Sequence, residues 1–302
     1  MKKFLLAGCG IWLLAIVAMS QKNVSENTLL WEVSGNGLKQ PSYLFGTMHL
    51  MCAADTKLSD NLKTVIKESD QIYFEIDMDN FMEILGAMKY LKMNGNKKLQ
   101  DLITEEEYKK VKDYFVKNPG MIPLDMMQYF KPYFISSLIS EKSMACANDG
   151  GMEQSIMEES KQYKKEIKGL ETVEFQASVF DSIPYELQAK ELVKYLDSAD
   201  KNNDNTKELI AVYKSQDLKK IQELTEKEEG GTSQFMDLLL YNRNADWVQK
   251  ISNIIPGSKV LFAVGAAHLP GEKGLINLLR KKGYTLKPMD NTLNGSGTGI
   301  NL

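Results

Sequence analysis

The first part of the chain shows short apolar runs that are typical of strands, followed by a helical repeat. Residues 29–33 and 42–46 are two such runs, and the turn sequence Ser34-Gly35-Asn36-Gly37 between them indicates a β-hairpin. Apolar residues at helical spacing come next: Leu58, Leu62, Val65 and Ile66. Residues 71–78 have the composition of a further strand. This part is therefore predicted to form a hairpin, a helix and a strand.

The rest of the chain is mostly helical and ends with more strands. Residues 80–166 and 185–252 show helical spacing, the second interrupted by the polar stretch 200–205. Residues 259–265 are a continuous apolar run between turn residues, which is typical of a strand buried on both faces. Shorter strands are predicted at residues 166–171 and 284–289.

Two segments, one near each end of the chain, repeat the same order. Residues 42–78 and 259–289 each read as a strand, a Gly-x-x-His sequence, a helix and a second strand. This predicts an α/β (α+β) fold in which two pseudo-repeat halves form one central mixed sheet surrounded by helices. Because no linker rich in Pro, Gly or Ser divides the chain, we expect one domain over residues 21–290, followed by a flexible tail, 291–302.

The N-terminus has the features of a signal peptide. Lys2 and Lys3 precede an apolar run over residues 4–19, and small residues around Ser20 suit cleavage after that position. The run is shorter than the ~20 residues of a membrane-spanning helix. Cys9 stands too early in it for a lipoprotein anchor. We therefore expect residues 1–20 to be removed from an exported protein, periplasmic or secreted.

Composition narrows the class of protein. Of the 302 residues, 43% are hydrophobic and 25% charged, as in a folded globular protein. The net charge is −3 and the basic residues are scattered, which argues against a nucleic-acid partner. After residue 20 no segment is long and apolar enough to be expected to cross a membrane.

Cleavage of a signal peptide would leave two cysteines, Cys52 and Cys146. A pair of cysteines in an oxidising compartment is a candidate disulfide. The alternative is two unrelated buried thiols. Neither cysteine has a neighbour at the spacing of a cysteine zinc site.

Histidine is the informative residue type, because the chain has only two, His49 and His268. Each follows a predicted strand in a Gly-x-x-His sequence, which begins at Gly46 and Gly265 respectively. Ligands of α/β sheets gather outside the carboxyl ends of strands, where glycine allows a close approach of the backbone. Two matching motifs that contain every histidine favour a shared site. The alternative is that both are structural residues hydrogen-bonded near a loop.

A metal site built on two histidines needs a further ligand, usually a carboxylate. Glu75 is the best candidate, since it lies at the end of the predicted strand 71–78 inside an apolar run. Asp77, two residues later in the same predicted strand, shares a face with Glu75. A solvent-exposed strand face is the alternative explanation. Histidine with carboxylate suits a divalent ion and does not distinguish Zn, Mn and Co.

Arg243 is a further candidate, in a helix that is apolar through Phe235, Leu238, Leu239 and Trp247. Its guanidinium could stabilise an anionic intermediate or bind a substrate carboxylate. It could equally pair with Asp246 or another acid for structural reasons.

These motifs together resemble the TraB/PrgY/GumN family, often called the TIKI family after its animal members. The shared features are the two Gly-x-x-His sequences, the strand with Glu75, the segment 169–176 that contains Glu171, and the Arg243-Asn244 step. The resemblance covers about residues 29–289. It implies a fold similar to the erythromycin-esterase and ChaN-like group, with two related halves around a mixed sheet.

The resemblance also implies metal-dependent peptidase activity. It places His49, Glu75 and His268 at the metal, with Arg243 and Glu171 in supporting roles. We therefore expect an exported metal-dependent hydrolase, a peptidase that attacks a peptide or protein with a metal-activated water. The alternative is a non-catalytic envelope protein that binds haem, a metal or a peptide in the same cleft, or one whose ancestral site has decayed.

Overall fold

The computed structural model describes residues 25–118, 123–144, 149–227 and 233–293. The predicted signal peptide, most of the predicted tail and Cys146 lie outside these residues. Among the described residues, no helix has the length and apolar character needed to span a bilayer.

A six-stranded sheet forms the centre of the molecule, in the order β6-β4-β7-β2-β1-β8. Its strands are β1 (Leu30–Gly35), β2 (Ser42–Thr47), β4 (Gln71–Phe74), β6 (Glu166–Gly169), β7 (Val260–Gly265) and β8 (Tyr284–Pro288). β6, β4, β7 and β2 pair in parallel, whereas β1 runs antiparallel to both β2 and β8. The prediction of a mixed sheet is confirmed.

The strands follow the apolar pattern of the sequence. All six residues of β2 and the first five of β7 are buried, as expected for central strands covered on both faces. β1 and β2 form the predicted hairpin, whose turn uses positive φ at Gly35 (77°), Asn36 (48°) and Gly37 (80°). Glycine adopts such angles without steric cost, which explains this turn sequence.

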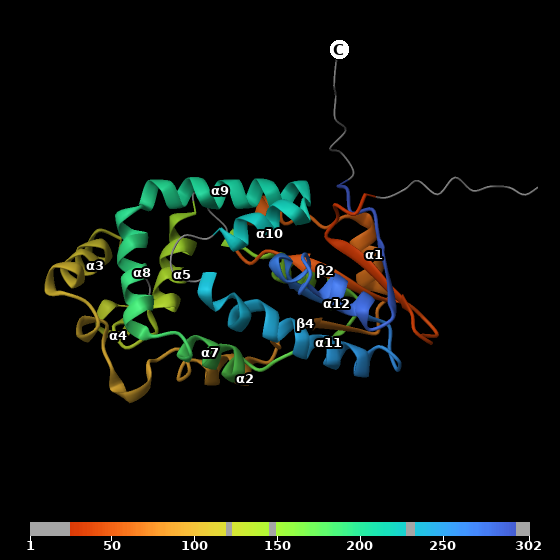
Figure 1. The fold of residues 1–302 in the computed structure, drawn as a ribbon, viewed down its shortest axis with the longest axis horizontal. Coiled ribbons are helices and arrows are strands. Elements are labelled where there is room, and N and C mark those ends of the chain that lie inside the picture. The colour runs from red at the N-terminus through yellow and green to blue at the C-terminus, as the bar shows by residue number, and fades with distance from the viewer. Residues whose placement is uncertain (1–24, 119–122, 145–148, 228–232, 294–302) are drawn as a thin grey trace, which may run out of the picture.

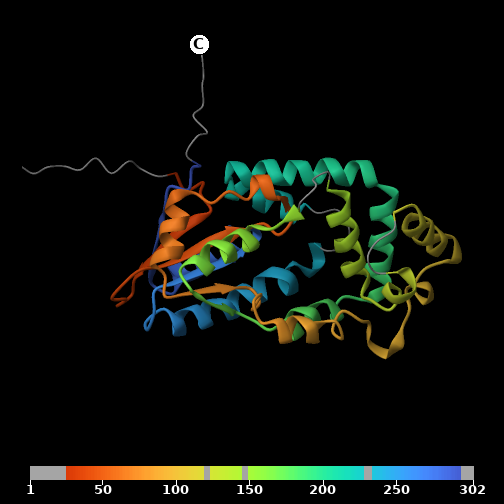
Figure 2. The same ribbon diagram turned by 180° about the vertical axis from the view of Figure 1, so that it is seen from behind.

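Helices cover both faces of the sheet (Figures 1 and 2). One face carries α11 (Asn242–Ile254) and α12 (Leu275–Lys281), and the other carries α1 (Asp60–Glu68) and α6 (Met152–Gln162). A short second pairing joins β3 (Met51–Cys52) to β5 (Asp149–Gly150). The main core lies between these layers and includes Trp31, Phe45, Phe74, Trp247 and Phe262.

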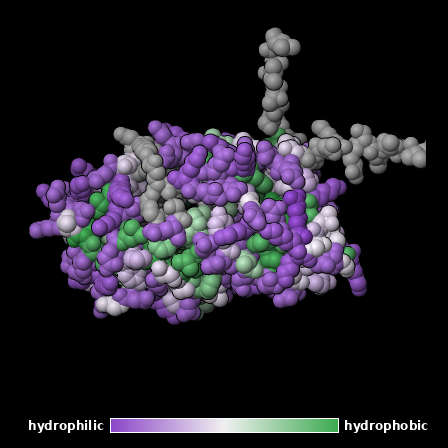
Figure 3. All heavy atoms as spheres, viewed as in Figure 1, coloured by the Kyte–Doolittle hydropathy of each residue, from purple (hydrophilic) through white to green (hydrophobic). Residues whose placement is uncertain are grey.

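A second core lies in a helical lobe beside the sheet, formed by α3 (Glu105–Lys117), α4 (Leu124–Met127), α5 (Pro132–Ser143) and α8 (Tyr185–Asp197). α9 (Ala199–Ser215) runs from this lobe to the sheet (Figure 1), where Tyr213 joins the main core. The remaining helices are α2 (Phe81–Ala87), α7 (Val173–Asp181) and α10 (Leu218–Glu226). The face drawn in Figure 3 is mostly hydrophilic, with hydrophobic residues gathered near its middle.

Two details differ from the sequence prediction. The polar stretch 200–205 does not interrupt a helix but forms the first turns of α9, in which Asp204 and Asn205 are exposed. The strand predicted over 71–78 ends at Phe74. The N–H of Gly265 on the neighbouring strand bonds to the Glu75 carboxylate at 2.9 Å, so the backbone ladder between β4 and β7 does not continue. The pseudo-repeat of the two halves stays a prediction.

Lys131 holds the helical lobe together from inside. Lys131 is only 1% exposed. Its Nζ lies 2.9 Å from Asp181 Oδ1 and donates to the Ala177 carbonyl at 2.7 Å. The same Asp181 oxygen accepts a hydrogen bond from the Tyr185 hydroxyl. The network thus joins the starts of α5 and α8 to the end of α7.

Substitution Lys131→Met should destabilise the protein by about 2–4 kcal/mol, because it leaves Asp181 and the Ala177 carbonyl without their buried cation. Lys110→Met is the matched control, since Lys110 pairs with Asp197 at the surface, where such pairs contribute about 0–1 kcal/mol. Urea unfolding of both variants measures the difference. Equal stability of the two would contradict a structural role for the Lys131 network.

Candidate active site

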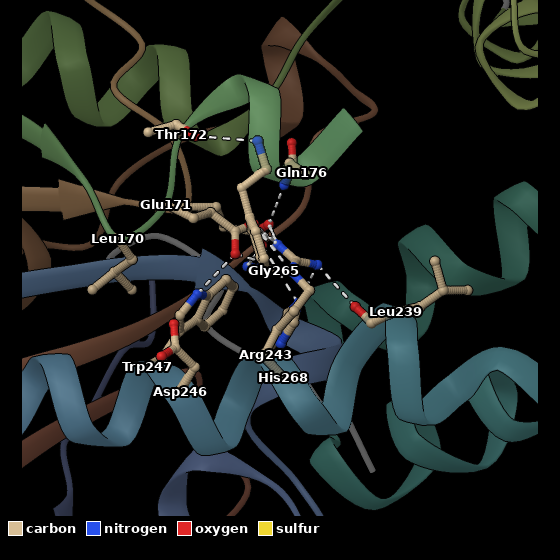
Figure 4. Close-up of polar contacts among 12 residues, drawn as sticks. Leu170, Glu171, Thr172, Gln176, Leu239, Arg243, Asp246, Trp247, Gly265 and His268 are labelled. Carbon is tan, nitrogen blue, oxygen red and sulfur yellow. Dashed lines mark hydrogen bonds and ion pairs between the residues drawn. The ribbon is translucent and has the colours of Figure 1, made fainter. Parts of the chain in front are cut away.

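The predicted site residues lie at one edge of the sheet, where β2, β4, β6 and β7 end. Gly46 is in the last part of β2, and Gly265 ends β7. Glu75 follows β4 directly, and Glu171 follows β6 by two residues. Because these strands are parallel neighbours, their carboxyl ends bring these positions to the same edge. Figure 4 shows Arg243 and His268 meeting Glu171 there.

Arg243 is the centre of the cluster. It lies in the first turn of α11, is buried, and places its guanidinium between two carboxylates (Figure 4). Nη2 donates to Glu75 Oε2 at 2.7 Å and also to Glu171 Oε1, while Nε donates to Glu171 Oε1 at 3.0 Å. One cation therefore holds the acids that follow β4 and β6.

The remaining N–H groups of Arg243 are directed at protein acceptors as well. Nη1 donates to the Leu239 carbonyl at 2.8 Å and lies 3.4 Å from His268 Nε2. A guanidinium has five N–H groups, and each of them has an acceptor here. The arginine is thus saturated by the protein, and an incoming oxyanion would have to displace one of these partners.

The pKa values of the two carboxylates are shifted in opposite directions. Burial raises the pKa of Glu75, but His268, Arg243 and the N–H of Gly265 together bring it down to about 2. Gln176 also donates to Glu75 Oε2, at 3.0 Å. For Glu171, burial outweighs its bonds to Arg243 and Trp247, and its pKa lies above the ordinary value. Glu75 is therefore the more firmly ionised of the pair.

His268 is held in one tautomer. Asn244 Nδ2 donates to the carbonyls of Lys273, at 2.9 Å, and of His268, at 3.3 Å, which fixes the orientation of the amide. Its Oδ1 therefore faces His268 Nδ1, 2.6 Å away, and an oxygen at that position requires the proton to be on Nδ1. The lone pair of Nε2 points into the cluster, 3.7 Å from Glu75 Oε1.

Burial also keeps His268 neutral. The residue is buried, and its ring stacks on Trp247 with centroids 4.4 Å apart. Burial lowers the pKa of His268 to about 3, because the protein interior disfavours the imidazolium. At neutral pH its Nε2 is thus a permanent acceptor.

His49 lies at the rim of the same site. Its side chain is 63% exposed, and its Nδ1 is 2.7 Å from Glu153 Oε1. Partial desolvation lowers the pKa of His49, but the bond to Glu153 and the negative charges of Glu153 and Glu75 outweigh it and raise the pKa. His49 also interacts electrostatically with His268, which lowers the pKa of His268 further. The two imidazoles therefore face one site in opposite states.

Asp77 and the cysteines do not contact the Arg243 cluster directly in the described residues. Asp77 lines a pocket of about 530 Å³ that Glu171, Phe175 and Lys250 also line. Burial and the adjacent Asp79 raise the pKa of Asp77. Cys52 is disulfide-bonded, and its predicted partner, Cys146, lies outside the described residues.

Three residues around the site were missed from the sequence. They are Glu153 beside His49, Gln176 beside Glu75, and Tyr213, whose hydroxyl donates to the Gly46 carbonyl at 2.9 Å. Gln176 lies in the segment that carries the family resemblance. Glu153 follows Gly150-Gly151, which reads as a simple break between helices, and no pattern in the sequence points to Tyr213.

The donor atoms of the cluster do not make up a complete set of metal ligands. His268 Nε2 and Glu75 Oε1 face each other. Arg243 contacts both residues, so its guanidinium is already the cation beside these two groups. Within the described part of the chain, no group of three or more His, Cys, Asp or Glu residues is placed so that it could hold a metal. Catalytic zinc sites use three protein ligands. The present arrangement does not fit a resident metal.

Comparisons with known proteins agree with the motifs. A sequence model of the TraB/PrgY/gumN family matches residues 29–288, from the start of β1 to the end of β8, which confirms the predicted family. The chain is similar to "Metalloprotease TIKI homolog" of Amphimedon queenslandica, with 22% identity over 89% of this chain and 63% of that protein.

Vertebrate relatives match at a similar level. They include "Metalloprotease TIKI2" of Danio rerio, with 21% identity over 89% of this chain and 62% of that protein. "Metalloprotease TIKI1" of Homo sapiens has 20% identity over 86% of this chain and 62% of that protein. The chain spans less than two thirds of the length of these relatives.

The low pKa of Glu75 predicts how stability depends on pH. Its folded pKa of about 2 lies below the ordinary 4.5, so its contribution is present above pH 4.5 and is lost as the pH falls toward 2. The shift corresponds to about 3 kcal/mol. The low pKa of His268 also makes the folded state less stable in acid. This loss of stability starts near pH 6.5, where the histidine of the unfolded chain takes up a proton that the folded protein does not bind.

Glu75→Gln should be less stable than the wild type at pH 7, because Arg243 loses one of its two counter-charges. It should also lose less stability between pH 4.5 and 2. Urea unfolding at a series of pH values measures both effects. A variant whose acid-induced loss equals that of the wild type would contradict the assigned ionisation of Glu75.

Proposed function

This chain belongs to the TraB/PrgY/gumN family, and from that premise we propose that it is a hydrolase that cleaves peptide bonds. The observation that carries the proposal is the contact of His268 with Glu75 at the sheet edge to which the parallel strands β2 and β7 bring both Gly-x-x-His sequences. The names of the relatives support a peptidase, at about 20% identity. Export through the N-terminal segment is part of the same proposal.

In this proposal His49 contacts the substrate. It is the exposed imidazole, and its raised pKa keeps it protonated at neutral pH. A protonated imidazole can donate a hydrogen bond to the scissile carbonyl oxygen, where negative charge develops during attack. His49 would thus polarise the C=O bond of the peptide group whose C–N bond is cleaved.

Glu75 and His268 orient the attacking water. Glu75 Oε1 and His268 Nε2 are two acceptors 3.7 Å apart, close enough for one water molecule to donate to both. At neutral pH the carboxylate is ionised and the imidazole neutral. Glu75 Oε1 has a second lone pair beside its bond from Gly265, and the water would displace the 3.4 Å contact of Arg243 Nη1 from the single lone pair of His268 Nε2. The pair would hold the water in a fixed direction, which lowers the entropic cost of attack.

Arg243 acts as a positioning residue in this proposal. Its N–H groups bind Glu75, Glu171, His268 and the Leu239 carbonyl. It therefore sets the place of the acceptors instead of binding the oxyanion. Glu171 in turn fixes Arg243 and lies away from the reacting atoms.

The relatives are named metalloproteases, which brings a metal ion into the proposal. Histidine with carboxylate would suit a divalent ion such as Zn, Mn or Co. A bound ion of this kind would polarise a carbonyl and lower the pKa of a water molecule. Because the described arrangement does not supply three ligands, the roles above are assigned to side chains alone. Dependence on a metal is decided by experiment.

A peptide library incubated with the purified protein tests the function. We expect cleavage by the wild type, and a fall in kcat of about 10²–10⁴-fold in His49→Gln, His268→Gln and Glu75→Gln, since each removes a group that handles water or the carbonyl. Glu158→Gln, an exposed change on α6, is the control and should cleave as the wild type does.

A parallel series with a chelator tests the metal. Loss of cleavage on chelation, restored by Zn, Mn or Co, would show a metal-dependent peptidase, and unchanged cleavage would assign the reaction to the side chains. If the wild type cleaves no peptide in either series, the proposed hydrolase is wrong. Haem or peptide binding without cleavage would then favour the non-catalytic alternative.

A further inference from the structure

The loop that carries His49 is held by three contacts from distant helices. The Tyr213 hydroxyl of α9 donates to the Gly46 carbonyl at 2.9 Å. The Met152 N–H of α6 donates to the Met48 carbonyl at 3.1 Å. Glu153, also of α6, contacts the His49 ring at 2.7 Å. The start of α6 therefore holds both the backbone and the side chain of this motif.

Gly151, at the start of α6, allows this close contact. A Cβ atom at this position would lie 2.5 Å from Glu153 Oε2 and 2.7 Å from the His49 carbonyl oxygen. Its φ of −88° is open to every residue, so the requirement for glycine comes from space and not from backbone conformation. A larger residue would separate α6 from His49.

Glu153 and His49 differ sharply in exposure. The Glu153 side chain is 4% exposed, whereas that of His49 is 63% exposed. A substrate can therefore touch His49 but not Glu153. Any effect of Glu153 on a reaction must act through the imidazole.

The two histidines have matching supports of different chemistry. Asn244 Oδ1 lies 2.6 Å from His268 Nδ1, and Glu153 Oε1 lies 2.7 Å from His49 Nδ1. Each Nδ1 thus faces a buried oxygen from a helix, which leaves Nε2 for the site. The Asn244 contact is a hydrogen bond, whereas the Glu153 contact is an ion pair at close distance, and Glu153 Oε1 has no other partner among the described residues. One support is a neutral amide and the other a carboxylate.

We infer that Glu153 is the positioning residue of His49. It holds the proton on Nδ1, directs Nε2 away from α6 into the site, and depends on Gly151 for its approach. Loss of such a partner on the far nitrogen of a metal-ligating histidine typically costs 10–100-fold in metal affinity or activity, and we expect an effect of that size for His49. The inference deepens the proposed function, on which its kinetic part rests; the ring contact itself can be tested without any substrate.

Histidine-selective ¹⁵N NMR tests the ring contact, because the whole chain contains only two histidines. In the wild type we expect a hydrogen-bonded Nδ1–H for each imidazole. Glu153→Leu should remove the His49 signal and leave that of His268, and Glu153→Gln should weaken the His49 signal because an acceptor oxygen remains without the charge. Glu158→Gln on the same helix is the control and should change neither histidine.

Kinetics on a cleaved peptide form the second arm. We expect kcat to fall about 10-fold in Glu153→Gln and about 100-fold in Glu153→Leu, with KM unchanged because the side chain is buried. Gly151→Ala should give a similar loss with Glu153 still present. Gly86→Ala is its control, since a Cβ at Gly86 meets nothing within 4 Å.

The two arms separate the possible failures. An unchanged His49 signal in both Glu153→Gln and Glu153→Leu would overturn the inference, whatever the kinetics show. A lower unfolding free energy with normal His49 signals would assign Glu153 to folding alone. If Glu153→Leu does not fold, Glu153→Gln and Gly151→Ala decide. Absence of cleavage by the wild type would refute the proposed function and leave the NMR result to decide on Glu153.

Discussion

The site depends on one buried cation between two buried acids. Arg243 joins α11 to the ends of β4, β6 and β7, and each of its N–H groups has an acceptor. Replacing a buried ion pair by apolar groups often costs little stability, but removing one partner leaves an uncompensated charge. The value of Arg243 thus lies in what it fixes: the direction of the Glu75 carboxylate and the spacing of Glu75 from His268. Trp247 completes the cluster, because its indole N–H donates to Glu171 and its ring lies under the Arg243 guanidinium.

The two histidines come from equivalent motifs, yet the fold makes them chemically different. His268 follows a central strand, is buried, and is held by an amide that accepts its single proton. His49 follows the neighbouring strand but lies at the rim, on a carboxylate. At neutral pH one imidazole is therefore an acceptor and the other a donor. The difference arises from the helices that support them, α11 and α6, and not from the motifs.

Much of the fold is encoded locally. The hairpin follows from the glycines of its turn, and β7 follows from its continuous apolar run. The two Gly-x-x-His sequences stand out because the chain has no other histidine. These features depend on neighbours in the sequence or on rare residues, so they can be read without a structure. They predict the family, the mixed sheet, and Glu75, Arg243 and His268 as candidate site residues.

Partnerships between distant segments could not be read in this way. The sequence left open whether Arg243 pairs with Asp246 or serves a site, and only the parallel order of the strands places Glu75 and Glu171 around it. In the sequence Glu153 is an ordinary helix residue. Only the close packing at Gly151 brings its carboxylate to His49 Nδ1. Asp77 does not share a strand face with Glu75, because β4 ends at Phe74. Such contacts join residues more than 70 positions apart, and their geometry is set by strand order and helix packing. A local pattern of residue types carries no record of either.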